Sequence, residues 1–274
     1  MRPQGSVSHT VEFIARSEAT KQSMKEGRYI YCIIATKTSK DFGSLGIGGR
    51  GDGLYTICFD GIAAVVSNSP ITKYPVSSEN VSAHERAIEE VMKEHTVLPV
   101  RFCTIAEDEE KIKKILEKEY DRFKALLNKF KNKKELGLKA IFKEGAIYKD
   151  ILEKYKEIKT LKEKVEGLPP DSTHYQRMEI GRMVESALRR EKESYKEEIL
   201  NLLSPLAVEV KTNLPYGEEM IINGAFLIEN DREMEFDQKV QELDTRYEDK
   251  IRFKYVGMLP PFNFVTLVIE TGRY

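Results

Sequence analysis

The residues that could carry nucleophilic or metal chemistry are few and scattered. The chain has four histidines and three cysteines among 274 residues. His84 and His95 stand eleven positions apart, whereas metal ligands on one helix need a spacing of about three or four. Cys32, Cys58 and Cys103 each lie in or beside an apolar run without a C-x-x-C pair, which indicates buried, reduced thiols. With no convergent catalytic set, we expect no enzyme, no metal site and no cofactor.

A glycine-rich stretch is the one motif with the letters of a nucleotide site. Residues 46–51, GIGGRG, match the pattern G-x-G-x-x-G. That chemistry needs the loop to open a helix whose N-terminus holds the pyrophosphate. Here the loop precedes an expected strand at residues 54–59, so we interpret it as a plain loop. The alternative function that it leaves open is a ferredoxin-like module that senses a small molecule or a nucleotide.

Arg101 is the first candidate contact residue, because it interrupts the apolar run at residues 97–102. A guanidinium buried in a strand needs a charged partner. Glu85 or Glu89, on the helix expected just before this strand, could supply it. Two interpretations stay open: a structural ion pair within the domain, or a contact with a partner protein.

Phe262 and Phe264 are the second candidate, in the segment LPPFNFV at residues 259–265. Pro260 and Pro261 cannot donate backbone hydrogen bonds, so the preceding strand must end there. The two rings alternate with Asn263, which places both on one side. They either hold the C-terminal segment on the body of the protein or form a partly exposed apolar contact for a partner.

Composition excludes several classes of partner. The chain is 41% hydrophobic and 32% charged, with a net charge of −1, so no overall field attracts nucleic acid or anionic lipid. No apolar run approaches the roughly 18 residues that a membrane span requires. The first residues lack the apolar block of a secretory signal. We therefore expect a cytoplasmic protein that binds neither nucleic acid nor a lipid membrane, with residues 1–28 as a flexible extension.

The elements that must position these residues begin with three strands. Residues 29–35 form an apolar run typical of a buried strand. Residues 54–59 and 62–67 flank Asp60 and Gly61, the dipeptide that favours a tight hairpin turn.

Two helices and a fourth strand complete the N-terminal half. A capping box at Ser82 and Glu85, with Ser78 as a rival cap, starts a helix before the strand at residues 97–102. A second box at Thr104 starts a long helix that continues to residue 130. The predicted order is β–loop–ββ–α–β–α, a modified ferredoxin-like domain at residues 29–132 whose first helix is replaced by a loop.

The C-terminal half repeats this order without repeating the sequence. Strands are expected at residues 136–143, 206–211, 220–228 and 251–256, with a helix at residues 232–247. Two helices within residues 147–203 are joined by a short Gly-Pro link, which predicts an antiparallel hairpin. The fold class is therefore α+β, with a second, ferredoxin-like βαββαβ domain at residues 133–274 that contains the inserted hairpin.

Seven segments, spread in order along the chain, together resemble one family. They are YIYCII at residues 29–34, GIAAVVS at 61–67, AHERAIEEVM at 83–92, LPVRFCT at 98–104, HYQRMEIGRMVESAL at 174–188, NGAFLIE at 223–229 and LPPFNFV at 259–265. The family that they are similar to is the gas vesicle protein F/L family. The chain departs from its pattern at Cys103, where the family more often has Gly, and at Met258 and Leu259, where a Gly-Pro-Trp-like sequence usually precedes the prolines. The segments do not separate the F branch from the L branch.

The resemblance implies a non-enzymatic accessory protein of gas vesicle formation. Proteins of this family are thought to bind the small, very hydrophobic shell protein or other accessory proteins, and to help start or extend the shell. It also implies association with the gas vesicle and two α/β domains.

Overall fold

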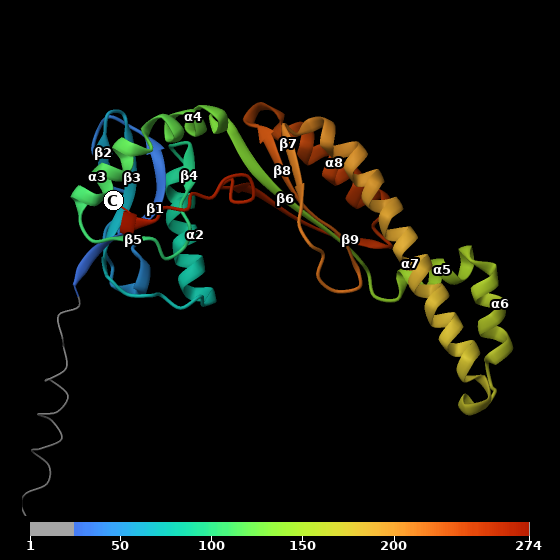
Figure 1. Cartoon of the computed structure of the whole chain (residues 1–274). Coiled ribbons are helices and arrows are strands. Elements are labelled where there is room, and N and C mark those ends of the chain that lie inside the picture. The colour runs from blue at the N-terminus through green and yellow to red at the C-terminus, as the bar shows by residue number, and fades with distance from the viewer. Residues whose placement is uncertain (1–24, 274) are drawn as a thin grey trace, which may run out of the picture. The chain divides into compact units, whose positions relative to one another are not determined.

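The protein folds into two antiparallel sheets and seven helices, α2 to α8, within residues 25–273, which are the residues that this computed structural model describes (Figure 1). The mixed α and β architecture predicted from the sequence is confirmed. The predicted flexibility of residues 1–24 concerns residues outside the described part of the chain. Residues 26–28, also predicted to belong to that extension, form the start of the first strand.

The first sheet has the strand order β2-β3-β1-β4, and β5 also pairs with β1. Its strands are β1 (Glu26–Ala35), β2 (Tyr55–Phe59), β3 (Ile62–Pro70), β4 (Val97–Pro99) and β5 (Ile105–Ala106). Counted along the chain, the first four strands stand in the order of a ferredoxin-like sheet. The hairpin between β2 and β3 is confirmed, because Asp60 and Gly61 both have positive φ, at 40° and 86°, as a type I′ turn requires.

A loop covers the first sheet where a ferredoxin-like fold would have its first helix. Between β1 and β2 the chain forms only the three-residue turn Ile47–Gly49. The Ile47 side chain is fully buried, and its N–H donates to Tyr31 Oη at 2.7 Å. Tyr31 Oη lies 2.9 Å from Ser67 Oγ, so the loop is fastened to two neighbouring strands. The glycine-rich stretch therefore has a structural role in this unit.

Both predicted capping boxes of the N-terminal half are wrong. Helix α2 (Ser78–Met92) begins earlier than Ser82, and the Oγ of Ser77 accepts the Asn80 N–H at 3.3 Å. Thr104 starts no helix, because the residues after it join β1 as β5. Helix α3 (Glu109–Lys118) is capped instead by Asp108, which accepts the Lys111 N–H at 2.9 Å. The helix predicted to be continuous is then interrupted before α4 (Tyr120–Phe130).

The second sheet has the order β7-β8-β6-β9, again that of a ferredoxin-like fold. Its strands are β6 (Lys133–Phe142), β7 (Glu209–Thr212), β8 (Met220–Glu229) and β9 (Ile251–Leu259). Helices α7 (His174–Leu203) and α8 (Glu233–Arg246) lie along one face (Figure 1). The apolar core between them includes Phe226 and Phe236, both fully buried.

The predicted helical hairpin is present, but its first arm is broken. Helix α5 (Ala146–Lys154) ends at Tyr155, whose φ of −103° and ψ of 83° are not helical, and α6 (Lys156–Val165) continues. Glu191 of α7 accepts hydrogen bonds from Lys154 Nζ at 2.6 Å and Tyr155 Oη at 2.8 Å. The break is thereby held against α7.

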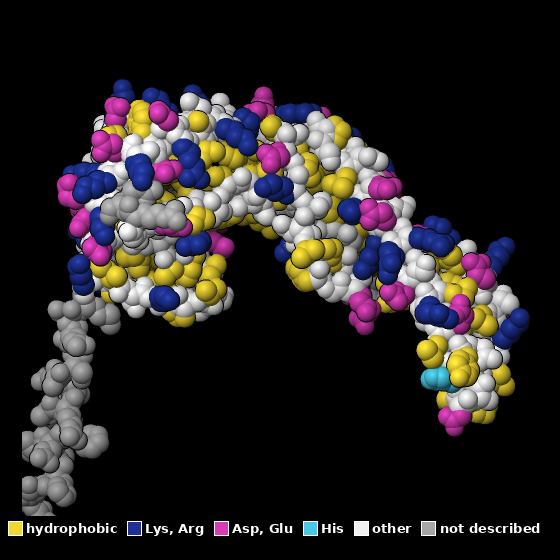
Figure 2. Space-filling model, in the orientation of Figure 1, with side chains coloured by type: hydrophobic (Ala, Val, Ile, Leu, Met, Phe, Trp, Pro, Cys, Tyr) yellow, Lys and Arg dark blue, Asp and Glu magenta, His cyan; other side chains and the backbone are white. Residues whose placement is uncertain are grey.

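The described residues divide into two compact units. The first comprises residues 25–91, 100–124 and 268–273, and the second comprises residues 92–99 and 125–267. The predicted domain boundary between residues 132 and 133 stays a prediction. Figure 2 shows basic and acidic side chains interspersed on the visible face of each unit. No helix in residues 25–273 combines the length and apolar character that crossing a membrane requires.

Phe236→Ala tests the core of the second unit. Phe236 is fully buried, and its ring centroid lies 5.1 Å from that of Phe226. Its truncation should lower the free energy of unfolding by about 3–5 kcal/mol. Met234→Ala, on the same helix at a side chain that is 76% exposed, should change it by less than about 0.5 kcal/mol. Urea denaturation followed by circular dichroism measures both. Equal midpoints for the two variants would contradict this core assignment.

Candidate partner-binding sites

Arg101 lies outside the strands, in the connection between β4 and β5, and is exposed. It forms no salt bridge with any described residue, so the predicted buried ion pair with Glu85 or Glu89 is wrong. The acidic residues agree with this, because the pKa of Glu85 is raised by burial and by the charge of Glu89. A guanidinium beside Glu85 would lower it.

A tight turn explains why Arg101 leaves the sheet. The Val100 N–H still donates to Tyr31 O at 2.9 Å, but β4 has already ended at Pro99. Thr104 Oγ1 donates to Arg101 O at 2.6 Å across the turn, and Cys103 adopts a left-handed φ of 63°. That conformation favours glycine, the residue that the family resemblance leads one to expect at this position.

A buried chain of hydrogen bonds holds the turn around Arg101 and Cys103 in place. His84 Nε2 lies 3.1 Å from Val100 O, and His84 Nδ1 lies 3.1 Å from Tyr29 Oη. Because a carbonyl only accepts, Nε2 carries the proton, and Nδ1 accepts from the Tyr29 hydroxyl. Tyr29 Oη in turn accepts the Cys103 N–H at 2.8 Å. Burial lowers the pKa of His84 to about 4, so the ring is neutral and every polar atom of this chain is satisfied.

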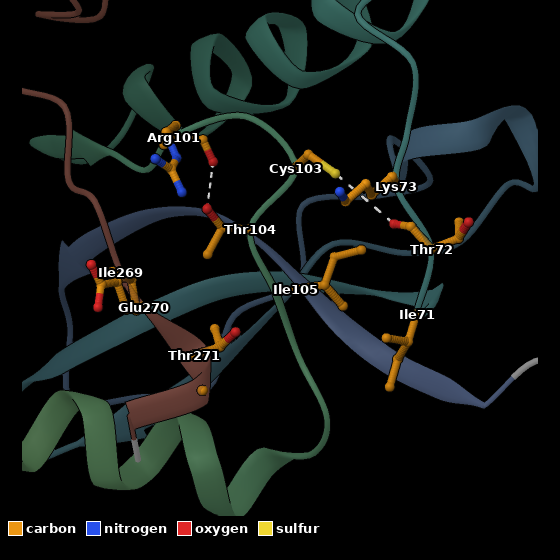
Figure 3. Close-up of a pocket in the computed structure, with 11 residues that line it drawn as sticks. Ile71, Thr72, Lys73, Arg101, Cys103, Thr104, Ile105, Ile269, Glu270 and Thr271 are labelled. Atoms are coloured by element: carbon orange, nitrogen blue, oxygen red, sulfur yellow. Dashed lines mark hydrogen bonds between the residues drawn. The ribbon is translucent and has the colours of Figure 1, made fainter.

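A surface pocket of about 480 Å³ opens beside the turn, within the first unit. Figure 3 shows that its lining comes from three segments: the connection after β3, the connection between β4 and β5, and the C-terminal segment. The lining residues are Ile71, Thr72, Lys73, Arg101, Cys103, Thr104, Ile105, Ile269, Glu270, Thr271 and Gly272.

The chemistry of this pocket suits recognition. Arg101 and Lys73 are exposed cations without a salt bridge to a described residue. Ile71, which is 40% exposed, lines the side of the pocket away from Arg101 (Figure 3). A cation next to apolar surface fits a carboxylate or carbonyl of a partner segment. Cys103 Sγ contacts Tyr74 N at 3.3 Å, and no imidazole in residues 25–273 hydrogen-bonds to a thiol. The same residues contain no cluster of three or more His, Cys, Asp or Glu that could hold a metal ion.

Cys32 is buried, as predicted, and all three cysteines are free thiols. Cys58 and Cys103 are half-buried, less than predicted. The structure does not bring the three together into one site, because Cys32 lies in β1, Cys58 in β2 and Cys103 in the turn after β4.

Phe262 and Phe264 lie in a turn that follows β9, which ends at Leu259 directly before the two prolines. Both rings are half-buried. The Phe264 ring centroid lies 5.5 Å from Lys211 Nζ, a cation–π contact. Half-burial leaves each of the two predicted roles open, because both residues are neither fully packed nor fully exposed.

Asn263, between the two rings, holds this segment on the second sheet through Glu135. The Asn263 N–H lies 2.9 Å from one carboxylate oxygen of Glu135, and its Nδ2 lies 2.5 Å from the other. Lys211 Nζ donates to Asn263 O at 2.9 Å. Burial raises the pKa of Glu135, whereas the Asn263 hydrogen bonds and the Lys211 charge oppose that rise. Sequence reasoning missed Glu135, because no local spacing connects it to a residue 128 positions later.

The nucleotide interpretation of the glycine-rich stretch finds no support in this geometry. Its three-residue helical turn is followed by β2, and the Gly46 N–H donates to Asp52 O at 2.9 Å. The loop thus closes on itself instead of directing the N-terminus of a helix toward a phosphate.

Comparison with known proteins identifies what the whole chain is similar to. The family model described as gas vesicle synthesis protein GvpL/GvpF matches residues 27–266. Gas vesicle protein F of Nostoc sp. strain PCC 7120 is 26% identical, over 89% of this chain and 100% of the relative. Gas vesicle protein L1 of Halobacterium salinarum is 22% identical, over 89% of this chain and 92% of the relative. The crystal structure of the gas vesicle protein GvpF from Anabaena sp. PCC7120 has a TM-score of 0.75 at 25% identity and covers 89% of this chain and 100% of its own.

His84 should make stability depend on pH. Its pKa is about 4 in the folded protein and about 6.5 when unfolded, so the unfolded chain binds more protons between these values. The free energy of unfolding should therefore fall as the pH drops from 6.5 toward 4, by up to roughly 3 kcal/mol. His84→Asn should flatten this slope, and His174→Gln, at an exposed histidine, should retain it. Thermal melts across this pH range measure the slope. An imidazole NMR signal of His84 that titrates near pH 6.5 would refute the assignment.

Asn263→Ala should weaken the attachment of the C-terminal segment. The change removes one of the two hydrogen bonds to the buried Glu135 carboxylate and the hydrogen bond that Asn213 Nδ2 donates to Asn263 Oδ1 at 3.0 Å. Their loss should cost about 1–3 kcal/mol, most of it from the buried carboxylate. Glu135→Gln with Asn263 intact should cost a similar amount, because a glutamine amide has one acceptor oxygen for the two Asn263 donors. Thermal unfolding measures both variants, with Asn201→Ala on the exposed surface of α7 as the control. A loss no greater than that of the control would contradict the role given to this contact.

Proposed function

Because the chain belongs to the gas vesicle synthesis protein GvpL/GvpF family, we propose that it is a non-catalytic accessory protein that binds the small hydrophobic shell protein or other accessory proteins during gas vesicle assembly. The observation that carries this proposal is the family match over residues 27–266, which includes most of both units. A protein of this kind acts in the cytoplasm and associates with the growing vesicle. No cofactor takes part.

The pocket around Arg101 is the proposed contact region of the first unit. An accessory protein needs surface groups that are free to meet a partner, and Arg101 offers an exposed guanidinium that forms no ion pair with any residue in 25–273. Arginine is enriched among the residues that dominate binding energies, because its planar donors pair with carboxylates and carbonyls. Ile71, at the other side of the same pocket, adds exposed apolar area.

Phe262 and Phe264 are the proposed contact residues of the second unit. Their half-buried rings stand on a segment that Asn263 and Glu135 hold in place. Aromatic groups on a rigid support lose little conformational entropy when they bind. This arrangement supports a role in contacting an apolar partner, and the shell protein is the apolar member of the proposed partners.

A deletion and complementation experiment tests the assembly role. Deleting this gene from cells that normally form gas vesicles should leave fewer or no vesicles, and the wild-type gene should restore them. Affinity purification of the tagged chain after cross-linking should recover the shell protein or another vesicle component. Normal vesicles in the deletion strain, together with no cross-linked vesicle component, would refute the proposed function.

Arg101→Ala tests the contact region separately. Since Arg101 is exposed and has no ion pair with a described residue, the free energy of unfolding should change by less than about 0.5 kcal/mol. Partner binding should weaken by about thirtyfold, the loss of an arginine worth roughly 2 kcal/mol at an interface. Arg182→Ala, on the hairpin, is the control and should bind as the wild type does. If Arg101→Ala also binds as the wild type, the pocket is not the contact region.

A further inference from the structure

One face of the second sheet is only half covered by the rest of its unit. Leu138 and Ala140 of β6 point into the core that the sheet forms with its helices. Alternation along a strand therefore places Lys139 on the opposite face. The segment around Asn263 covers that opposite face near Glu135. The rest of that face carries Lys139 of β6 and Arg252, Lys254 and Val256 of β9. We name this part of the sheet the open half-face.

The open half-face concentrates positive charge at an unfavourable spacing. Lys139 of β6 stands directly opposite Lys254 of β9 in the strand register, and Arg252 stands opposite Ile141. Arg252 is thus a diagonal neighbour of Lys139. Like charges directly opposite each other on antiparallel strands destabilise a sheet. Three cations this close together need nearby negative charge to offset their repulsion.

No described residue forms a salt bridge with these three cations. Lys254 and Arg252 are exposed and form no salt bridge within residues 25–273. Lys139 Nζ contacts only the side chain of Tyr216, with its hydroxyl oxygen at 3.1 Å and its ring centroid at 5.3 Å. Other lysines of this unit do have carboxylate partners, for example Lys134 with Glu233 at 2.6 Å. Exposed lysines elsewhere in the unit, such as Lys159 and Lys162, also lack a salt bridge to a described residue. What distinguishes this half-face is that its three cations stand close together across the register of β6 and β9.

Apolar groups and an unpaired strand edge adjoin the cations. Val256, two residues after Lys254 on β9, is 52% exposed, and Tyr216 is 60% exposed. Strand β9 is the last strand of its sheet and pairs only with β6 among the described strands. Its outer backbone N–H and C=O groups can therefore accept a further strand.

We propose that β9 and the open half-face bind an extended acidic segment of a partner protein, which adds to the sheet as a strand beside β9. Alternate side chains of the bound segment lie on the same face as Arg252, Lys254 and Val256. The side chains opposite Arg252 and Lys254 are acidic, and the side chain opposite Val256 is apolar. Carboxylates meet the cations, the apolar side chain packs on Val256, and the backbone bonds to the edge of β9. The identity of a biological partner rests on the proposed accessory role. The binding test itself does not depend on that role.

The same observations favour a polypeptide over other anions. Nucleic acids are held by many phosphate contacts, whereas here three cations stand beside exposed apolar side chains on a chain of net charge −1. An anionic lipid surface or free phosphate would use the cations but not the strand edge. Only an extended polypeptide uses the charges, the apolar side chain and the backbone groups together.

A peptide titration of the full chain tests this proposal. The probes are blocked peptides Glu-Thr-Glu-Thr-Val and Val-Thr-Glu-Thr-Glu, which cover parallel and antiparallel addition to β9. One of them should bind saturably and shift the backbone amide signals of β9 in NMR spectra. Binding should weaken at about 1 M NaCl, where the screening length is near 3 Å. The analogues with Lys in place of Glu should not bind.

Charge reversal provides the matched comparison. The double variant Arg252→Glu and Lys254→Glu should lose at least about tenfold in affinity for the acidic probe, which corresponds to about 1.4 kcal/mol. It should gain affinity for the Lys analogue. The control double variant Lys159→Glu and Lys162→Glu, at exposed positions of α6, has the same net charge and should bind as the wild type does.

Four outcomes would overturn the proposal. They are no binding of either acidic probe, equal binding by the charge-reversed variant, equal binding of the Lys analogue, and amide shifts confined to residues away from β9. Inorganic phosphate, a single-stranded oligonucleotide and vesicles of anionic phospholipid are titrated in parallel. If one of them binds the half-face and the peptides do not, the ligand is that anion. If the peptides do not bind but vesicle formation still depends on the gene, this inference is refuted and the proposed function stands.

Discussion

The requirement that buried polar groups be hydrogen-bonded determines how both candidate contact segments are held. In the first unit, the His84 ring joins Val100 O to the Tyr29 hydroxyl, which accepts the Cys103 N–H. In the second, Glu135 accepts two hydrogen bonds from Asn263. Each chain of bonds connects a buried side chain to an irregular segment, so the irregular segment is ordered without belonging to a sheet ladder. Arg101 and the two phenylalanines are carried by segments of this kind.

This arrangement suits a protein that acts by binding. A contact residue on an ordered loop is exposed without being freely mobile, and less conformational entropy is lost when a partner arrives. The left-handed Cys103 is part of the same arrangement, since its φ of 63° directs the chain back toward β1 after Arg101 has left the sheet. The chain belongs to the gas vesicle synthesis protein GvpL/GvpF family, and its proposed contact residues stand on segments of this ordered, accessible kind.

Charged side chains form ion pairs along α7, whereas the exposed cations of the proposed contact regions form none with a described residue. Along α7, acidic and basic side chains pair at helical spacing, as Lys196 does with Glu193 at 3.0 Å. Arg101 in the first unit, and Arg252 and Lys254 in the second, are exposed and form no such pair within the part of the chain that the structure describes. Exposed ion pairs add little stability, so the unpaired cations cost the fold little and leave charge available for partners.

Sequence patterns alone determined the elements whose signals are local. The apolar run of β1, the Asp60–Gly61 turn, the end of β9 before Pro260 and the antiparallel helical hairpin all follow from backbone preferences or periodicity of neighbouring residues. The ferredoxin-like order of both halves followed from the order of these elements, and the family from segments spread along the chain. The predicted helix starts at Ser82 and Thr104 were wrong. Helix α2 begins before Ser82, and the residues after Thr104 pair with β1 instead of starting a helix.

Tertiary structure decided what depends on residues far apart in the chain. An arginine within an apolar run looks buried, and only the pairing of β5 with β1 turns the chain early enough to expose Arg101. The contact between Glu135 and Asn263 spans 128 positions, and the opposition of Lys139 to Lys254 depends on the register of β6 and β9. Local sequence encodes the conformations available to each segment. Which side chains meet is decided by how strands pair across the sheet, because a change of register by one residue would place every side chain on the other face.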